Sequence, residues 1–149
     1  MTIRKGEPWG SPGALPADGV VVRTDAEARA AVSAARRSGV EPPVLGLLGG
    51  DLCRAVGGTG DASRLREGGT ALPVDLGAVL VDGRLHWFVA HLVARKGWWR
   101  GPIVAAMNAQ HLGTWDVAPR GHPNDGRLDV IEVERSFGLG DRWKARRRL

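Results

Sequence analysis

The dipeptide Asp82-Gly83 constrains the fold of this chain more than any other feature of its sequence. It separates two segments rich in strand-forming residues, 74–81 and 84–93. An Asp-Gly pair in this position is typical of a β-hairpin with a type I′ turn. The register of a two-residue turn then places four nearly all-apolar pairs on one face, which we predict to meet the core: Leu80 and Leu85, Ala78 and Trp87, Leu76 and Val89, Val74 and His91.

The composition favours short strands and loops over a helical bundle. Glycine (22) and proline (9) together make up about a fifth of the 149 residues. This length suits one domain, or one small domain that carries a fragment of another. The single cysteine, Cys53, excludes an internal disulfide framework and a multi-cysteine zinc site, and its apolar neighbours indicate a small buried side chain.

Charge and hydropathy predict a cytoplasmic protein. No apolar run approaches the roughly 20 residues of a membrane span, and the N-terminus lacks the apolar stretch of a signal peptide. The net charge of +5 is concentrated in residues 141–149, where one acid faces five basic residues. We therefore expect no specific nucleic-acid surface over the body of the chain, and we predict a helical, arginine-rich tail that is either solvated or held at an anionic membrane surface.

A second candidate for membrane contact lies in a short segment of cations and indole rings. Lys96, Trp98, Trp99 and Arg100 suit a membrane interface or a stacked ligand. A packed corner beneath the strands is the alternative interpretation. Elsewhere, the four histidines show no metal-binding spacing, and no Gly-x-Ser-x-Gly sequence points to a serine hydrolase.

The N-terminal half predicts a β-α-β unit. After an irregular leader at 1–19, Val20–Val22 is a short buried strand, and Thr24 with Glu27 forms a capping box that starts a helix. This helix ends at Gly39, and residues 44–48 form a second strand. Such a unit implies a parallel strand pair.

Glycines stand between this second strand and a short helical segment. Gly49 and Gly50 precede Asp51, and the helix is expected over 52–56. Glycines at this position let backbone amides approach an anion such as phosphate. Residues 57–70 are predicted to be a connector rich in glycine, serine and charge.

The second candidate site is a polar loop between two apolar runs. Arg120, His122, Asn124 and Asp125 lie within six residues, and Pro119 and Pro123 argue against a central strand. A cation, an imidazole, an amide and a carboxylate presented together form either a site or an ordinary solvated loop.

Residues 118–130 resemble the A-P-x-A-x-x-x-D-G-x-L-D-V segment of the diacylglycerol kinase, sphingosine kinase and bacterial lipid kinase family. Residues 47–58 are similar to the family's G-T-G-N-D-x-A-R-x-L-G segment, with Asp51 and Arg54 on its Asp and Arg. A rival placement puts residues 58–61 on that segment. Residues 72–77 resemble the family's x-x-I-D-L-G entry into its sandwich, and the strand that ends at Asn108 is like its V-x-V-x-N.

This resemblance implies an α+β fold, with a truncated nucleotide-domain remnant at 20–70 and an antiparallel β-sandwich at 71–149. It implies ATP-dependent phosphorylation of a diacylglycerol-type lipid hydroxyl, with Mg²⁺ neutralising phosphate charge. Asp51 and Asp125 would be the catalytic carboxylates, facing each other across one cleft, and Asp125 would hold the metal. Gly49, Gly50 and Arg54 would lie near the nucleotide, and four residues would shape the cleft: Asn108, Arg120, His122 and Asn124.

The chain also departs from the family pattern. The family's phosphate-binding sequence, G-G-D-G-T followed by an N-E pair, does not occur, and Ala90 stands where the family has Asn. A non-catalytic lipid- or nucleotide-binding module of the same family is therefore the competing hypothesis. A third, a nucleic-acid binder that uses the arginine tail, predicts binding that falls steeply with salt.

Overall fold

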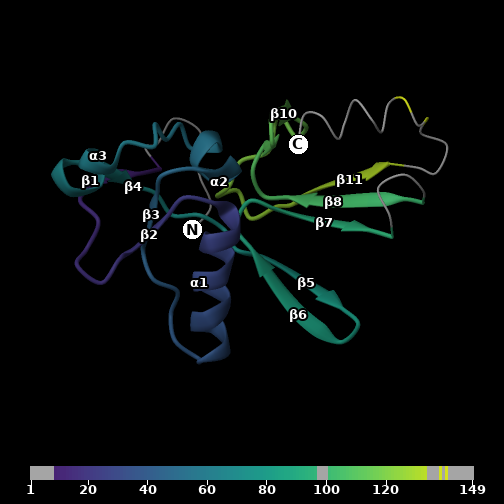
Figure 1. Cartoon of the computed structure of the whole chain (residues 1–149), viewed down its shortest axis with the longest axis horizontal. Coiled ribbons are helices and arrows are strands. Elements are labelled where there is room, and N and C mark those ends of the chain that lie inside the picture. Colours follow the sequence, from purple (N-terminus) through teal and green to yellow (C-terminus); the bar gives the residue numbers. More distant parts are fainter. Residues whose placement is uncertain (1–8, 97–100, 134–137, 139, 141–149) are drawn as a thin grey trace.

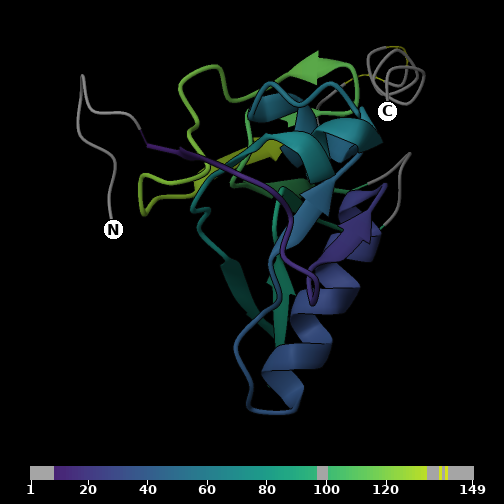
Figure 2. The same ribbon diagram turned by 90° about the vertical axis from the view of Figure 1, so that its left-hand side faces the viewer.

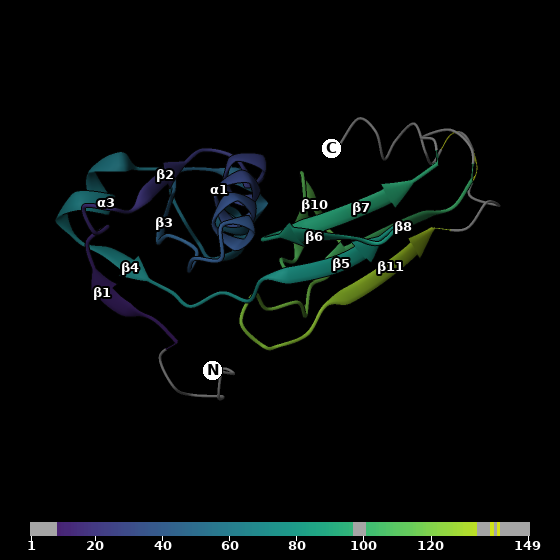
Figure 3. The ribbon, with the colours of Figure 1, turned by 90° about the horizontal axis from the view of Figure 1, so that it is seen from below.

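The helices lie in one part of the molecule and most of the antiparallel strands lie in another (Figure 3). The computed structural model describes residues 9–96, 101–133, 138 and 140. In Figure 3 the labelled elements that precede residue 72 lie on one side, and the strands from residue 77 onward lie on the other. The predicted α+β class is confirmed.

The predicted β-α-β unit is present. Strands β2 (Val20–Val22) and β3 (Leu45–Leu47) are parallel, and α1 (Asp25–Arg37) connects them. In Figure 2, α1 extends well below these two short strands. The Thr24 hydroxyl caps α1 by accepting from the Glu27 amide at 3.1 Å, as predicted, but the Glu27 carboxylate accepts from the Arg23 amide at 2.7 Å rather than from Thr24.

Two segments predicted to be irregular contain regular structure. Strand β1 (Ser11–Gly13) lies within the 1–19 leader and pairs antiparallel with β4 (Gly69–Ala71). Helices α2 (Gly50–Ala55) and α3 (Ala62–Glu67) follow β3, and α3 lies in the predicted connector. The two-stranded β1–β4 ladder tolerates Pro12 because it is all edge, and the Asp61 carboxylate starts α3 by accepting from the Ser63 amide at 2.9 Å.

The hairpin has the predicted turn and register. Strands β5 (Gly77–Val81) and β6 (Arg84–Phe88) pair Leu80 with Leu85, and both turn residues have positive φ, 49° at Asp82 and 74° at Gly83. These angles are those of a type I′ turn, in which a glycine at the second position is unstrained.

The second hairpin strand is shorter than predicted. It ends at Phe88, and the chain bends at the buried residues Val89 and Ala90 before β7 (His91–Arg95) begins. The Ala90 carbonyl accepts from the amides of Asn108 and Ala109, at 2.8 and 3.0 Å. The bend moves the chain to a new partner, so His91 pairs with Met107 of β8 (Ile103–Met107) and not with Val74.

The face prediction for the hairpin holds only near its base. Trp87 packs against the main core, but Leu80 and Leu85 are 71% and 53% exposed, because the hairpin projects from the body (Figure 1). Phe88, on the opposite face, is buried at 1% exposure. A continuous apolar face therefore does not imply burial where no other element covers it.

The remaining strands form a three-stranded antiparallel sheet in the order β11-β8-β7, with β11 spanning Asp129–Val133. Strands β9 (His111–Leu112) and β10 (Trp115–Asp116) make a short hairpin whose turn includes Gly113. In Figure 1 the β5–β6 hairpin points away from the three-stranded sheet, and no strand pairing joins them among the described residues. The sandwich arrangement stays a prediction.

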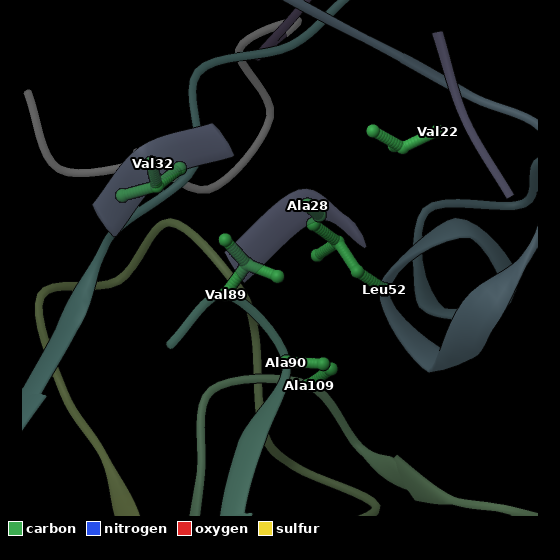
Figure 4. Close-up of a cluster of buried hydrophobic side chains, with 7 residues drawn as sticks. All are labelled: Val22, Ala28, Val32, Leu52, Val89, Ala90 and Ala109. Atoms are coloured by element: carbon green, nitrogen blue, oxygen red, sulfur yellow. The ribbon is translucent and has the colours of Figure 1, made fainter. Parts of the chain in front are cut away.

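The main hydrophobic core joins the two halves of the described chain. Its buried side chains come from both sides of the predicted boundary at residue 70, as Figure 4 shows: Val22, Ala28, Val32, Leu52, Val89, Ala90 and Ala109. A smaller cluster is formed by Ala105 and Met107 of β8 together with Ala118.

Several predictions fall on residues that the structure does not describe. Trp98, Trp99, Arg100 and the basic tail at 141–149 lie outside the described residues, whereas Lys96 is exposed. Within the described ranges, the helices are too short and too polar to cross a membrane.

Candidate functional site

A groove of about 480 Å³, with charged side chains among apolar ones in its wall, lies where the first turns of α1 and α2 meet β7 and the β9–β10 turn. It contains two of the predicted site residues, Gly50 and Asp51. Its full lining is Thr24, Asp25, Gly50, Asp51, His91, Val93, Arg95, Leu112 and Gly113. Elements separated by as many as 89 residues thus contribute to one groove.

The Asp25 carboxylate occupies the start of α2. Its two oxygens accept from the backbone amides of Asp51 at 2.6 Å and Leu52 at 3.1 Å. Gly50 has a φ of 92°, and a Cβ at this position would lie 2.6 Å from an Asp25 carboxylate oxygen. Glycine is therefore needed here for close approach of the Asp25 side chain, whereas Gly49 lies against the Arg23 carbonyl.

The Asp51 side chain joins α2 to the β9–β10 turn. It is 8% exposed, and one carboxylate oxygen accepts from the Gly113 amide at 2.8 Å. The Arg54 guanidinium lies 3.4 Å from the other oxygen and also donates to the Gly113 carbonyl. Asp51 and Arg54 thus bind both backbone groups of Gly113, which holds a turn 62 residues away from Asp51.

His91 is one of the groove residues that the sequence did not reveal as site residues. Its Nδ1 atom lies 3.6 Å from an Asp51 oxygen, which is ion-pair distance for a protonated ring but long for a hydrogen bond. This nitrogen is buried and makes no hydrogen bond with the described residues, while the side chain as a whole is 22% exposed. An imidazole beside a carboxylate is an arrangement that can take up or release a proton in catalysis.

The second predicted site, the polar loop, is organised around Asp75. The Asp75 amide donates to the Pro123 carbonyl and its carboxylate accepts from the Gly126 amide, both at 2.7 Å. The Asn108 side-chain amide donates to the carbonyls of Asp75 and Val89, both at 2.8 Å. Asn108 is 2% exposed, and its Oδ1 has no hydrogen-bond partner among the described residues.

Within this loop the predicted residues bind mainly one another and the backbone. The backbone N–H of the buried Asn124 donates to His122 Nδ1 at 3.2 Å, and the His122 ring contacts Trp9 edge-on, with centroids 4.5 Å apart. Asp125 accepts from the Arg127 amide at 3.0 Å, and Arg120 is exposed. These contacts are those of an ordered turn.

The predicted site residues therefore belong to two hydrogen-bonded groups. Gly50 and Asp51 line the groove and Arg54 contacts Asp51, whereas Asp125 lies in the loop whose backbone Asp75 binds at Gly126. Asp125 is not among the residues that line the groove with Asp51. In the part of the chain that the structure describes, no three or more His, Cys, Asp or Glu side chains gather to hold a metal, so the Mg²⁺ site at Asp125 stays a prediction.

Cys53 is a buried structural residue, as predicted. It is 3% exposed, and its thiol lies 3.6 Å from the Leu47 carbonyl, to which it donates. Burial raises the pKa of the Cys53 thiol, against a smaller lowering by a hydrogen bond from the Gly60 backbone. A neutral buried thiol is a poor nucleophile.

Comparison with protein-family models, with curated proteins and with solved structures found no match for this chain.

Proposed function

We propose that this chain is a lipid-kinase-like protein that binds lipid without transferring a phosphoryl group, and that it works in the cytoplasm at the periphery of a membrane. The family assignment rests on residues 118–130, 47–58 and 72–77, and it implies an antiparallel sandwich after residue 71. Its partners in this proposal are a lipid and an anionic membrane surface, and specific nucleic-acid binding is not part of it.

The observation that carries the proposal is the contact between Asp25 and the first turn of α2. The Asp51 and Leu52 amides are the donors that a bound phosphate would need at Gly49 and Gly50, and both already donate to the Asp25 carboxylate. A phosphate in this place would have to displace a carboxylate, and it would be repelled by that carboxylate's charge. This argues against ATP binding in the manner of the family.

The contacts of Asp51 and Arg54 support the same conclusion. Arg54 would be the cation nearest a nucleotide, but its guanidinium donates to the Gly113 carbonyl and lies against Asp51. The Asp51 carboxylate in turn accepts from the Gly113 amide. Both side chains hold two parts of the fold together, and this role requires no catalysis.

An active lipid kinase is the second candidate, and one observation favours it. Asp51 lines the groove together with His91 and Arg95, so a carboxylate, an imidazole and a cation surround a space of about 480 Å³. Phosphoryl transfer needs a carboxylate that positions the attacking hydroxyl, and Mg²⁺ that bridges the phosphates. In this alternative Asp51 is the catalytic residue and ATP binds with Mg²⁺.

Two measurements separate the candidates: thermal denaturation with Mg-ATP, and co-sedimentation with lipid vesicles. We expect no change in Tm at millimolar Mg-ATP, and we expect the chain to co-sediment with vesicles that contain phosphatidylserine, more than with phosphatidylcholine vesicles. A rise of several degrees with Mg-ATP that is lost in Asp51→Asn would establish the kinase alternative instead. An exposed carboxylate variant, Asp116→Asn, is the matched control.

A further inference from the structure

A second and larger cavity, of about 950 Å³, lies apart from the groove at Asp51 and shares none of its lining residues. One wall of the cavity is formed by the β1–β4 ladder and α3. The opposite wall is formed by β3 and the C-terminal end of α2. Its size lies at the upper end of the range of about 300–1,000 Å³ found for small-molecule sites. Part of its floor is the main core, through Val32, Leu52 and Val89, which Figure 4 shows together.

Most of the cavity wall is aliphatic. Leu15 follows β1 and Leu65 lies in α3, and the Leu15 amide donates to the Leu65 carbonyl at 2.7 Å. A Cβ at Gly46 would lie 2.9 Å from both leucine side chains, so the absence of a side chain there lets them settle on β3. Leu72 and Val74 continue the apolar wall, which suits a flexible hydrocarbon chain better than a polar ligand.

Two cations, Arg36 and Arg64, line the cavity beside this apolar wall, and Arg36 also contacts an aromatic ring. The Arg36 guanidinium lies 5.5 Å from the centre of the Trp87 ring, and both residues line the cavity. Its ion pair with Glu41 is 4.0 Å long and the Glu41 side chain is 90% exposed, so the pair is weak. The other lining acids are engaged nearby, Asp61 with Ser63 and Asp75 with Gly126.

We propose that this cavity binds one long-chain aliphatic carboxylate, with its chain along Leu15, Leu65, Leu72 and Val74 and its carboxylate at Arg36. The stacked guanidinium and indole recognise a ligand that is anionic at one end and apolar beyond it. The inference does not depend on the proposed function, because it uses a different part of the molecule. Neither a failure to bind vesicles nor a rise in Tm with Mg-ATP would contradict this inference.

Fluorescence quenching tests the site directly. 9,10-Dibromostearate, added below its critical micelle concentration, should quench indole fluorescence in a saturable manner at one molecule per chain. Trp87→Phe should remove most of the quenching while unlabelled palmitate still competes for binding. Across octanoate, dodecanoate and palmitate, affinity should rise by up to about fourfold for each methylene that is buried.

Further variants test where the ligand lies in the cavity. Leu72→Glu should weaken binding at least tenfold, whereas Leu80→Glu, at a leucine that is 71% exposed outside the cavity, should leave it unchanged. Arg36→Gln should weaken palmitate binding but not that of its methyl ester. Leu72→Trp, which fills the cavity with an apolar side chain, replaces Leu72→Glu if circular dichroism shows that the latter is unfolded.

Three outcomes would overturn the proposal. These are no saturable quenching below the micelle concentration, an equal loss of binding in Leu80→Glu, and full quenching in Trp87→Phe. Equal affinity of Arg36→Gln and the parent chain for palmitate would overturn the carboxylate position at Arg36.

Discussion

The Asp25 carboxylate accepts a 2.6 Å hydrogen bond from the backbone amide of Asp51, across 26 residues of sequence. It fixes the start of α2 against the first turn of α1. From there the Asp51 side chain reaches Gly113, and Arg54 reaches the same residue. A chain of polar contacts thus runs from the β-α-β unit to the strands that follow residue 71, alongside the core that the two halves share.

Removing the Asp25 carboxylate should destabilise the protein more than a surface acid does. Asp25→Ala leaves the Asp51 and Leu52 amides without their acceptor, and we expect a loss of about 1–3 kcal/mol of unfolding free energy. Urea denaturation followed by circular dichroism measures it. Glu41→Ala, which removes the exposed partner of Arg36, should change stability by less than about 0.5 kcal/mol. Equal effects of the two variants would contradict the anchoring role of Asp25.

The stability of the protein should depend on whether the side chain at position 51 can accept a hydrogen bond from Gly113. Asp51→Asn keeps an oxygen that can accept from the Gly113 amide, whereas Asp51→Ala removes it and leaves Arg54 without its carboxylate. We expect Asp51→Ala to cost about 2 kcal/mol or more, and Asp51→Asn to cost less. Hydrogen exchange at the Gly113 amide gives a local readout, which should rise strongly in the alanine variant only. Unchanged Gly113 exchange in Asp51→Ala would show that this bond does not hold the turn.

The local parts of the fold could be predicted from sequence, because their signals lie within a few residues. Asp82-Gly83 specified its turn, and Thr24 with Glu27 specified the start of α1. The bend at Val89 and Ala90 could not be predicted, since two buried apolar residues look like a continuing strand. Strand β1 was missed because its partner, β4, is far along the chain.

The groove was predictable only in part for the same reason. Gly50, Asp51 and Arg54 stood out as a glycine-rich strand-to-helix junction, but nothing near Asp25 or His91 in sequence indicates that they meet it. The polar loop was visible by its composition, whereas its dependence on Asp75 comes from contacts across about 50 residues. Long-range hydrogen bonds to backbone groups leave no local pattern in the sequence.

The Cys53 thiol should make stability depend on pH in the alkaline range. Burial raises the pKa of the thiol in the folded protein above its value in the unfolded chain. The folded state therefore holds its proton more tightly, so this contribution is complete below about pH 9 and is lost as the pH rises through the folded pKa. The difference in urea midpoint between the parent chain and Cys53→Ala should shrink from pH 8 to pH 10.5. A constant difference would contradict the raised pKa.

The pair Gly77 and Phe88 should tolerate no added methyl group. These residues are cross-strand partners in the hairpin, and a Cβ at Gly77 would lie 2.2 Å from the Phe88 ring, which is 1% exposed and cannot move outward easily. We expect Gly77→Ala to cost about 1–3 kcal/mol through displacement of that ring, measured by urea denaturation. Gly13→Ala is the matched control, because its Cβ would meet only the Ala71 methyl group, at an ordinary 3.7 Å. If both variants had the same stability, the Phe88 ring would not be packed on the Gly77 backbone.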